Sequence, residues 1–160
     1  MCRYYLDANV FIEAKNGPYG MDIVPSFWKL LDDQSEAGVI CSSTMVYEEL
    51  ATGNDELADW AKQRKNTDLF RDPCEDVQRI FNQIATYVQG RYPEHQAQRF
   101  LSGADAWVVA HAEVEDAVVV THEALVNEHS EKPKIPNICK RFGVEWVNAY
   151  QMLRELGARF

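Results

Sequence analysis

Four acidic residues stand where one fold could bring their carboxylates together. Asp7 directly follows a strand-forming run, and Glu49 lies two turns into a helix that follows a second run. Asp105 begins a helix that leads into a third run, and Glu123 comes shortly after it. Converging carboxylates repel one another unless cations lie between them, and such hard oxygen ligands suit Mg²⁺ or Mn²⁺. These ions activate bound water and stabilise the oxygens of a phosphoryl displacement, so the pattern favours phosphodiester chemistry.

Each acid also has a purely structural interpretation. Asp7 could cap the helix that starts at Ala8, and Asp105 could simply favour the positive end of its helix. Glu49 stands beside Glu48, and such a pair is usually a solvated helix face; Glu48 is also the alternative candidate for the same role. Glu123 could be a turn residue. Both interpretations therefore stay open for each acid taken alone.

The elements that would position these acids alternate along the chain. Apolar or β-branched runs predict strands at residues 3–6, 39–43, 117–121 and 144–147, and amphipathic segments between them predict helices. This alternation predicts a three-layer α/β/α fold with a mostly parallel central sheet, and several helices form an insertion between the second and third strands. In such folds ligands bind beyond the carboxyl ends of the strands, where three of the four acids are expected.

Length and composition bound the class of protein. The 160 residues, 46% of them hydrophobic, predict a single domain over residues 1–160. No apolar run approaches the roughly 18 residues of a membrane span, and the N-terminus lacks the features of a signal peptide. The four cysteines are scattered without a paired motif, so we expect reduced thiols in a cytoplasmic protein. The net charge of −9 argues against a protein that simply coats nucleic acid.

Four segments, met in order, resemble the PIN-domain family of metal-dependent nucleases, which includes the VapC-type toxins. They are YLDANVFI, SSTMVYEEL, GADAWVVAHA and VVVTHE, at residues 5–12, 42–50, 103–112 and 118–123. The longer spacers between them resemble a PIN-like branch distinct from a standard VapC. The resemblance spans most of the chain and implies a PIN-like fold.

The resemblance also implies roles for individual residues. Asp7, Glu49 and Asp105 match the acids that hold the metal, with Asn9 as a supporting polar group. Glu123 falls where the family usually has aspartate, so the second metal would be held differently or weakly. Thr121 would orient a neighbouring carboxylate or contact the phosphate. Four basic residues could hold the RNA backbone, with a solvated basic loop as the equal alternative: Lys132, Lys134, Lys140 and Arg141.

The function implied is hydrolysis of RNA phosphodiesters with Mg²⁺ or Mn²⁺ by the toxin of a toxin–antitoxin pair. The expected partners are the RNA, a small antitoxin protein and, as an option left open, a second copy of the chain. One alternative is a PIN-like module that binds without cutting, which the glutamate at position 123 favours. A haloacid-dehalogenase-type phosphatase ranks low, because it needs a second aspartate where Asn9 stands.

Overall fold

Five short strands form a parallel sheet at the centre of the molecule. The computed structural model describes residues 1–160 and orders the strands β3-β2-β1-β4-β5. Every neighbouring pair is parallel, and Tyr4 of β1 lies opposite both Ile40 and Val118. Because helices cover both faces, the central strand is buried along its whole length. The strands are β1 (Tyr4–Leu6), β2 (Ile40–Ser43), β3 (Phe70–Arg71), β4 (Val118–Val120) and β5 (Trp146–Val147).

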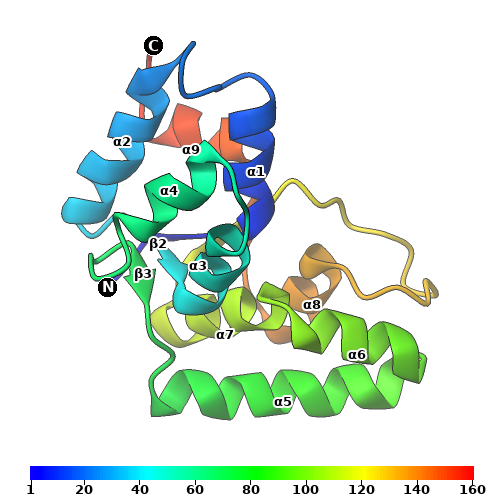
Figure 1. The fold of residues 1–160 in the computed structure, drawn as a ribbon. Helices are drawn as coiled ribbons and strands as arrows, with labels where there is room; N and C mark the ends of the chain where they lie inside the picture. Colours follow the sequence, from blue (N-terminus) through cyan, green and yellow to red (C-terminus); the bar gives the residue numbers. More distant parts are fainter.

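Nine helices form the two outer layers (Figure 1). On one face α7 packs against β1, β2 and β4, and α5 and α6 pack against α7. On the other face lie α1, α2 and α9, with α4 beside them. The helices are α1 (Ala8–Asn16), α2 (Pro25–Glu36), α3 (Thr44–Ala51), α4 (Glu56–Lys62), α5 (Glu75–Arg91), α6 (Glu94–Ser102), α7 (Asp105–Glu115), α8 (Ile135–Phe142) and α9 (Ala149–Glu155).

The predicted fold class is confirmed: a parallel sheet lies between two helical layers, and helices α3 to α7 lie between β2 and β4 along the chain. The sequence did not predict two of the elements. The edge strand β3 has only two residues, too few to show a hydrophobic pattern, and α6 directly follows α5 after the break at Pro93. None of the helices has the length and hydrophobicity of a membrane-spanning segment.

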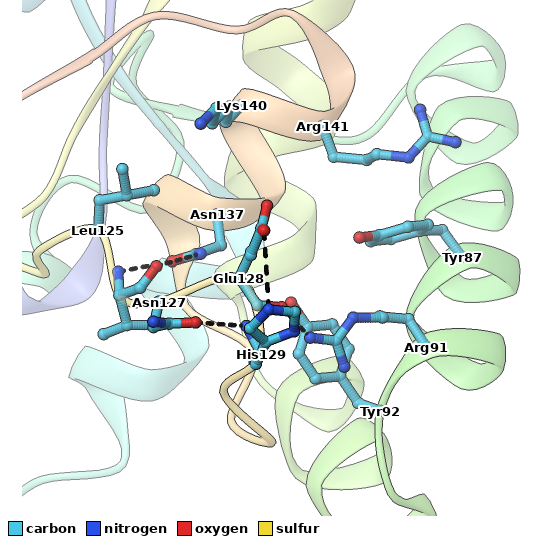
Figure 2. A pocket seen from close by; sticks show the side chains of 11 residues that line it. Tyr87, Arg91, Tyr92, Leu125, Asn127, Glu128, His129, Asn137, Lys140 and Arg141 are labelled. Carbon is cyan, nitrogen blue, oxygen red and sulfur yellow. Dashed lines mark hydrogen bonds and ion pairs between the residues drawn. The ribbon is translucent and has the colours of Figure 1, made fainter.

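The segment between β4 and α8 has no regular secondary structure, but side chains hold it in place (Figure 2). The guanidinium of Arg91, at the end of α5, donates to the backbone oxygens of Glu128 and Ser130. The Asn137 side chain accepts from the Val126 amide at 3.0 Å and donates to the Val126 carbonyl at 2.9 Å. These contacts pair backbone groups that have no strand or helix partner, and they fix the segment against α5 and α8.

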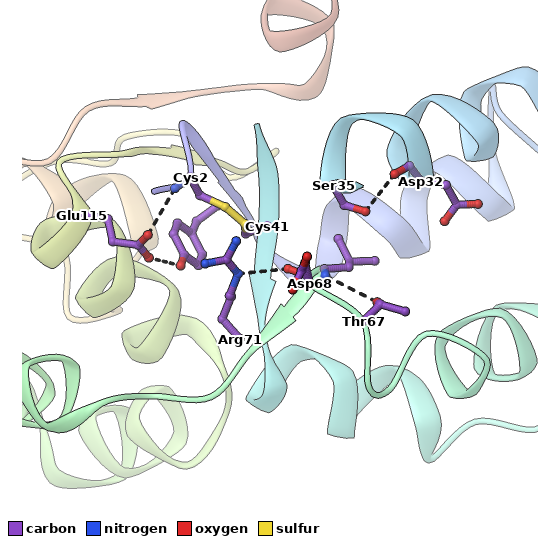
Figure 3. The surroundings of a disulfide bond; sticks show 10 residues. Cys2, Asp32, Ser35, Cys41, Thr67, Asp68, Arg71 and Glu115 are labelled. Atoms are coloured by element: carbon purple, nitrogen blue, oxygen red, sulfur yellow. Dashed lines mark hydrogen bonds between the residues drawn. A yellow bond between two sulfur atoms is a disulfide. The ribbon is translucent and has the colours of Figure 1, made fainter. Parts of the chain in front are cut away.

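Cys2 and Cys41 form a disulfide between the segment just before β1 and the neighbouring strand β2 (Figure 3). The expectation of four reduced cysteines is therefore wrong for these two, while Cys74 and Cys139 are free. The parallel pairing of β1 with β2 brings the two Cα atoms to 6.0 Å, within the range a disulfide bridges. The sequence gives no sign of this proximity, because 39 positions separate the residues.

The disulfide predicts a thiol count. Denatured protein prepared without reductant should expose two reactive thiols per chain, from Cys74 and Cys139, and four after reduction. Reduction should also destabilise the fold by about 3 kcal/mol, because the cross-link restricts the unfolded chain. Titration with a thiol reagent and a thermal melt measure both effects. The Cys2→Ser/Cys41→Ser double variant is the control, since its stability should not respond to reductant; four thiols before reduction would contradict the disulfide.

Candidate active site

Asp7 lies at the carboxyl end of the central strand, almost completely buried with 1% of its surface exposed. Its Oδ1 accepts a long hydrogen bond of 3.5 Å from the Asn9 amide and so caps α1. Its Oδ2 accepts a bond of 2.9 Å from Thr121 Oγ1. The Thr121 hydroxyl in turn accepts from the Glu123 amide at 3.1 Å. Thr121, just after β4, therefore orients Asp7 and links it to the segment that carries Glu123.

Glu49 and Glu123 each bind the amino-terminal end of a helix with one carboxylate oxygen. Glu49 Oε1 accepts from the Ala104 amide at 2.8 Å, at the start of α7. Glu123 Oε1 accepts from the Ile135 amide at 2.9 Å, at the start of α8. These amides have no partner within their helices, and the positive end of the helix dipole favours a carboxylate there. The same contacts tie α3 and the β4–α8 segment to the two helices.

Asp105 is the first residue of α7 and is partly buried, and its carboxylate makes no hydrogen bond within the chain. Burial, followed by the charges of Asp7, Glu123 and Glu49, raises the pKa of Asp105 to about 8. Lys134 acts in the opposite direction, which places its charge within reach of this carboxylate.

The pKa of Asp7 rises to about 7, mainly through burial and further through the charges of Glu123 and Glu49. The hydrogen bonds from Thr121 and Asn9 only partly offset this rise. Glu123 and Glu49 thus raise the pKa of both aspartates, and Asp7 also raises that of Asp105. The charges of Glu49 and Glu123 therefore act on both aspartates, of which Asp7 ends β1 and Asp105 begins α7.

The donor chemistry of this cluster fits a hard divalent cation, since it offers four carboxylates and a strong need for compensating charge. The side chains are not gathered into a finished site: no three His, Cys, Asp or Glu side chains form a group that could hold a metal ion as they stand. Glu49 and Glu123 are held by backbone amides, and mutual repulsion opposes closer approach. A coordination sphere would therefore require rotation of glutamate side chains toward the two aspartates.

The other predicted residues lie in different places, some at the acidic cluster and some away from it. Only Glu49 of the Glu48–Glu49 pair binds α7 and influences the two aspartates. Asn9 contributes its backbone amide to Asp7, and its side chain makes no hydrogen bond within the chain. Lys132 is exposed on the β4–α8 segment, and Lys134 lies near Asp105. Lys140 and Arg141, near the end of α8, line a different pocket.

Gly103 is a further residue of the site that the sequence prediction did not single out. A Cβ atom at this position would lie 3.0 Å from Glu49 Oε1, so the missing side chain leaves room for the carboxylate to reach the Ala104 amide. The small pair Gly103–Ala104 just before an acid at a helix start is the sequence signal that could have indicated this contact.

A family profile described as "Domain of unknown function (DUF4411)" matches residues 4–160. The chain belongs to the DUF4411 family. The match includes β1 and every acid of the candidate site, so the cluster is part of the DUF4411 domain. No significant match to a curated protein was found.

A solved structure shares the fold of this DUF4411 protein. It is a chain of VapBC2 from Rickettsia felis, solved bound to a DNA fragment from their promoter. The two chains are similar over 92% of this chain and 98% of that chain, with a TM-score of 0.54 and 17% sequence identity. At this identity the likeness concerns the fold alone, and it agrees with the PIN-like architecture predicted from the sequence.

Proposed function

We propose that this DUF4411 protein is a PIN-like endoribonuclease that depends on Mg²⁺ or Mn²⁺. The observation that carries the proposal is the acidic cluster at the carboxyl edge of β1 and β4, where burial and mutual repulsion raise the pKa of Asp7 and Asp105. Such a concentration of unfavourable charge is typical of functional sites. The fold shared with a VapBC2 chain supports the same proposal.

In this proposal the four carboxylates hold the cation, and each has a distinct part. Asp7 is preoriented by Thr121, and Asp105 is free of internal hydrogen bonds and so available as a ligand. Glu49 and Glu123 each have one carboxylate oxygen on a helix amide, and rotation of these side chains toward the aspartates would bring an oxygen of each to the cation. A bound divalent cation would supply an activated water and neutralise charge on the phosphate. The positive charge of Lys134 acts on Asp105 and partly offsets the repulsion from the other acids.

We also propose that the chain acts as the toxin of a toxin–antitoxin pair, held inactive by a small partner protein. The support is the likeness to a chain of VapBC2, which was solved with promoter DNA. The acidic body of the chain, −11 over residues 1–123, suits a partner with basic segments.

The alternative is a PIN-like module that binds but does not cut. Two observations favour it. Glu123 stands where the PIN-domain family, which the sequence resembles, usually has aspartate, and it binds the Ile135 amide. The four acids are also not gathered around one point. In this alternative Glu123 serves only to join the β4–α8 segment to α8.

A cleavage assay separates the two functions. Purified protein should degrade unstructured RNA with Mn²⁺ or Mg²⁺, and EDTA should stop the reaction. Asp7→Asn should be inactive, because a neutral amide cannot hold the cation in the same way. If wild type and Asp7→Asn leave RNA equally intact with both metals, the nuclease proposal fails and the binding module replaces it.

The neighbouring acids Glu48 and Glu49 provide a matched pair of variants. Glu49→Gln should lower the cleavage rate at least about tenfold, because it removes a charged ligand beside Asp7 and Asp105. Glu48→Gln carries the same chemical change one residue away and should cleave at the wild-type rate. Initial rates at saturating Mn²⁺ measure both. A larger loss for Glu48→Gln than for Glu49→Gln would reverse the assignment.

A further inference from the structure

A pocket of about 730 Å³ lies against the β4–α8 segment. We call it the α5–α8 pocket, because the end of α5 and the outer face of α8 form its walls and the β4–α8 segment closes one side (Figure 2). None of the four acids of the candidate active site lines it. Its distinctive residues are Tyr87, Arg91, Tyr92, Lys140 and Arg141.

Positive charge dominates this pocket although the protein carries a net charge of −9. Arg91, Lys140 and Arg141 all line it, against one acid, Glu128. The Glu128 carboxylate lies 3.8 Å from the imidazole of His129, and both side chains are 86% exposed. Lys140 and Arg141 form no ion pair with any acid of the chain. Three cations gathered without balancing acids favour an anionic ligand.

Two tyrosine rings hold the arginines of the pocket. The Arg141 guanidinium lies 4.9 Å from the centre of the Tyr87 ring, and that of Arg91 lies 4.6 Å from the Tyr92 ring. Figure 2 shows the Tyr87 hydroxyl directed into the pocket between the two arginines. Stacking on a ring restrains a guanidinium but leaves its N–H edges free to donate to phosphate oxygens. The Arg141 side chain makes no hydrogen bond or ion pair within the chain, so its N–H donors are available.

Helix α8 connects this pocket to the acidic cluster. Its first residue, Ile135, donates its amide to Glu123, and Lys140 and Arg141 stand in its last turn. The rise along a helix places Arg141 about 9 Å from Ile135. Lys134 stands just before the helix, and its charge lowers the pKa of Asp105. Cations thus stand at both ends of α8, Lys134 at the end joined to Glu123 and Lys140 with Arg141 at the pocket end, over a distance that a short stretch of an extended strand can span.

We propose that the α5–α8 pocket binds a backbone phosphate of single-stranded RNA next to the bond that is cut. This inference rests on the proposed ribonuclease function and extends it, because it assigns the path of the RNA. Arg141 and Lys140 contact the phosphate oxygens, Tyr87 holds Arg141 in place, and Arg91 mainly fixes the β4–α8 segment. The pocket recognises the charge of the RNA and not the identity of its bases, because the cations contact the RNA backbone.

The test measures binding of a fluorescently labelled, unstructured 12-nucleotide RNA to full-length protein. All proteins carry Asp7→Asn to prevent cleavage, and anisotropy is recorded over a series of salt concentrations. Lys140→Gln/Arg141→Gln should weaken binding about tenfold at moderate salt and reduce the slope of log K against log salt by about 0.7, the value for one single-strand phosphate contact. Lys62→Gln/Arg159→Gln removes one lysine and one arginine from exposed positions elsewhere and should leave both quantities close to the parent values.

Variants of Tyr87 test how the arginine is held. Tyr87→Leu should weaken RNA binding severalfold, because the Arg141 guanidinium loses its ring, whereas Tyr87→Phe keeps the ring and should bind close to the parent. Thermal melts of every variant show that the fold is intact.

Three outcomes overturn the proposal. RNA binding that does not change in Lys140→Gln/Arg141→Gln shows that the pocket lies off the path of the strand. An equal loss in Lys62→Gln/Arg159→Gln shows that net charge alone is responsible. A polyglutamate peptide that loses binding in Lys140→Gln/Arg141→Gln while RNA does not assigns the pocket to an acidic protein segment. Since the readout is binding, a failure here is distinct from a failure to cleave RNA in the wild type.

Discussion

Asp105→Asn is expected to abolish RNA cleavage and, in the same protein, to raise the stability of the metal-free fold. The loss of activity should be on the order of a thousandfold, because the amide removes a charged ligand but retains the shape of the side chain. The gain in stability follows from the environment of Asp105, whose carboxylate is partly buried, repelled by three other acids and without a hydrogen bond in the chain. A neutral amide relieves that repulsion.

Two measurements on the same preparations check this pair of effects. Cleavage rates with Mn²⁺ give the loss, and thermal melts in EDTA at pH 8 should give a midpoint several degrees above that of the wild type. Glu113→Gln makes the same acid-to-amide change on an exposed position of α7, so it should match the wild type in both. An Asp105→Asn protein that still cleaves RNA, or that melts below the wild type, contradicts the role assigned to this acid.

Opposite effects on activity and stability distinguish a functional acid from a structural one. Glu123 joins the β4–α8 segment to the start of α8, and its removal costs a hydrogen bond to the Ile135 amide. Asp105 makes no such bond. Proteins that concentrate like charges in a buried site give up stability for function. Of the four acids, Asp105 is therefore the one for which a purely structural interpretation has least support.

The sequence was informative about the sheet edge because strand ends are local features. Asp7 follows the buried run Tyr4–Leu6, and the β-branched run at Val118–Val120 sets the position of Thr121. The parallel pairing of these two strands then brings Thr121 Oγ1 to Asp7 Oδ2. Hydrophobic periodicity and strand propensity are enough to predict that Asp7 and Thr121 lie together, since the carboxyl ends of parallel strands meet at one edge.

Contacts between distant segments could not be predicted in this way. The Cys2–Cys41 disulfide depends on the register of β1 and β2, and the two-residue strand β3 on its pairing with β2. The α5–α8 pocket requires α5 and α8 to lie side by side, although their cations are some 50 positions apart. Hydrophobic periodicity shows which face of a helix is buried, but it does not show which helix lies against it.

The second large effect is expected in the pH dependence of stability. Without metal, the free energy of unfolding should fall as pH rises from 6.5 to 8, by about 2 kcal/mol, which corresponds to roughly 4–8 °C in the melting midpoint. The folded-state pKa values of Asp7 and Asp105, about 7 and about 8, lie well above the ordinary value of 3.8. The folded protein therefore holds protons that the unfolded chain releases, and each proton lost on raising the pH removes stability.

The buried His111 limits the pH range in which the effect of the two aspartates can be measured alone. Burial lowers the pKa of His111 to about 4, and its Nε2 has no hydrogen-bond partner. Below pH 6.5 the unfolded chain takes up a proton that the folded His111 refuses, so His111 destabilises the fold as pH falls. That trend opposes the effect of the aspartates between pH 4 and 6.5. The effect of the two aspartates is therefore clearest above pH 6.5.

A divalent cation should reverse the trend, because it binds the deprotonated cluster of the folded protein and not the unfolded chain. With millimolar Mn²⁺ the melting midpoint at pH 8 should rise by several degrees, and the increment should shrink at pH 6, where protons compete for Asp7 and Asp105. The Asp7→Asn/Asp105→Asn double variant should show neither the decline with pH nor the response to Mn²⁺. If Mn²⁺ stabilises this double variant as much as the wild type, the cation binds elsewhere and the four carboxylates are not its site.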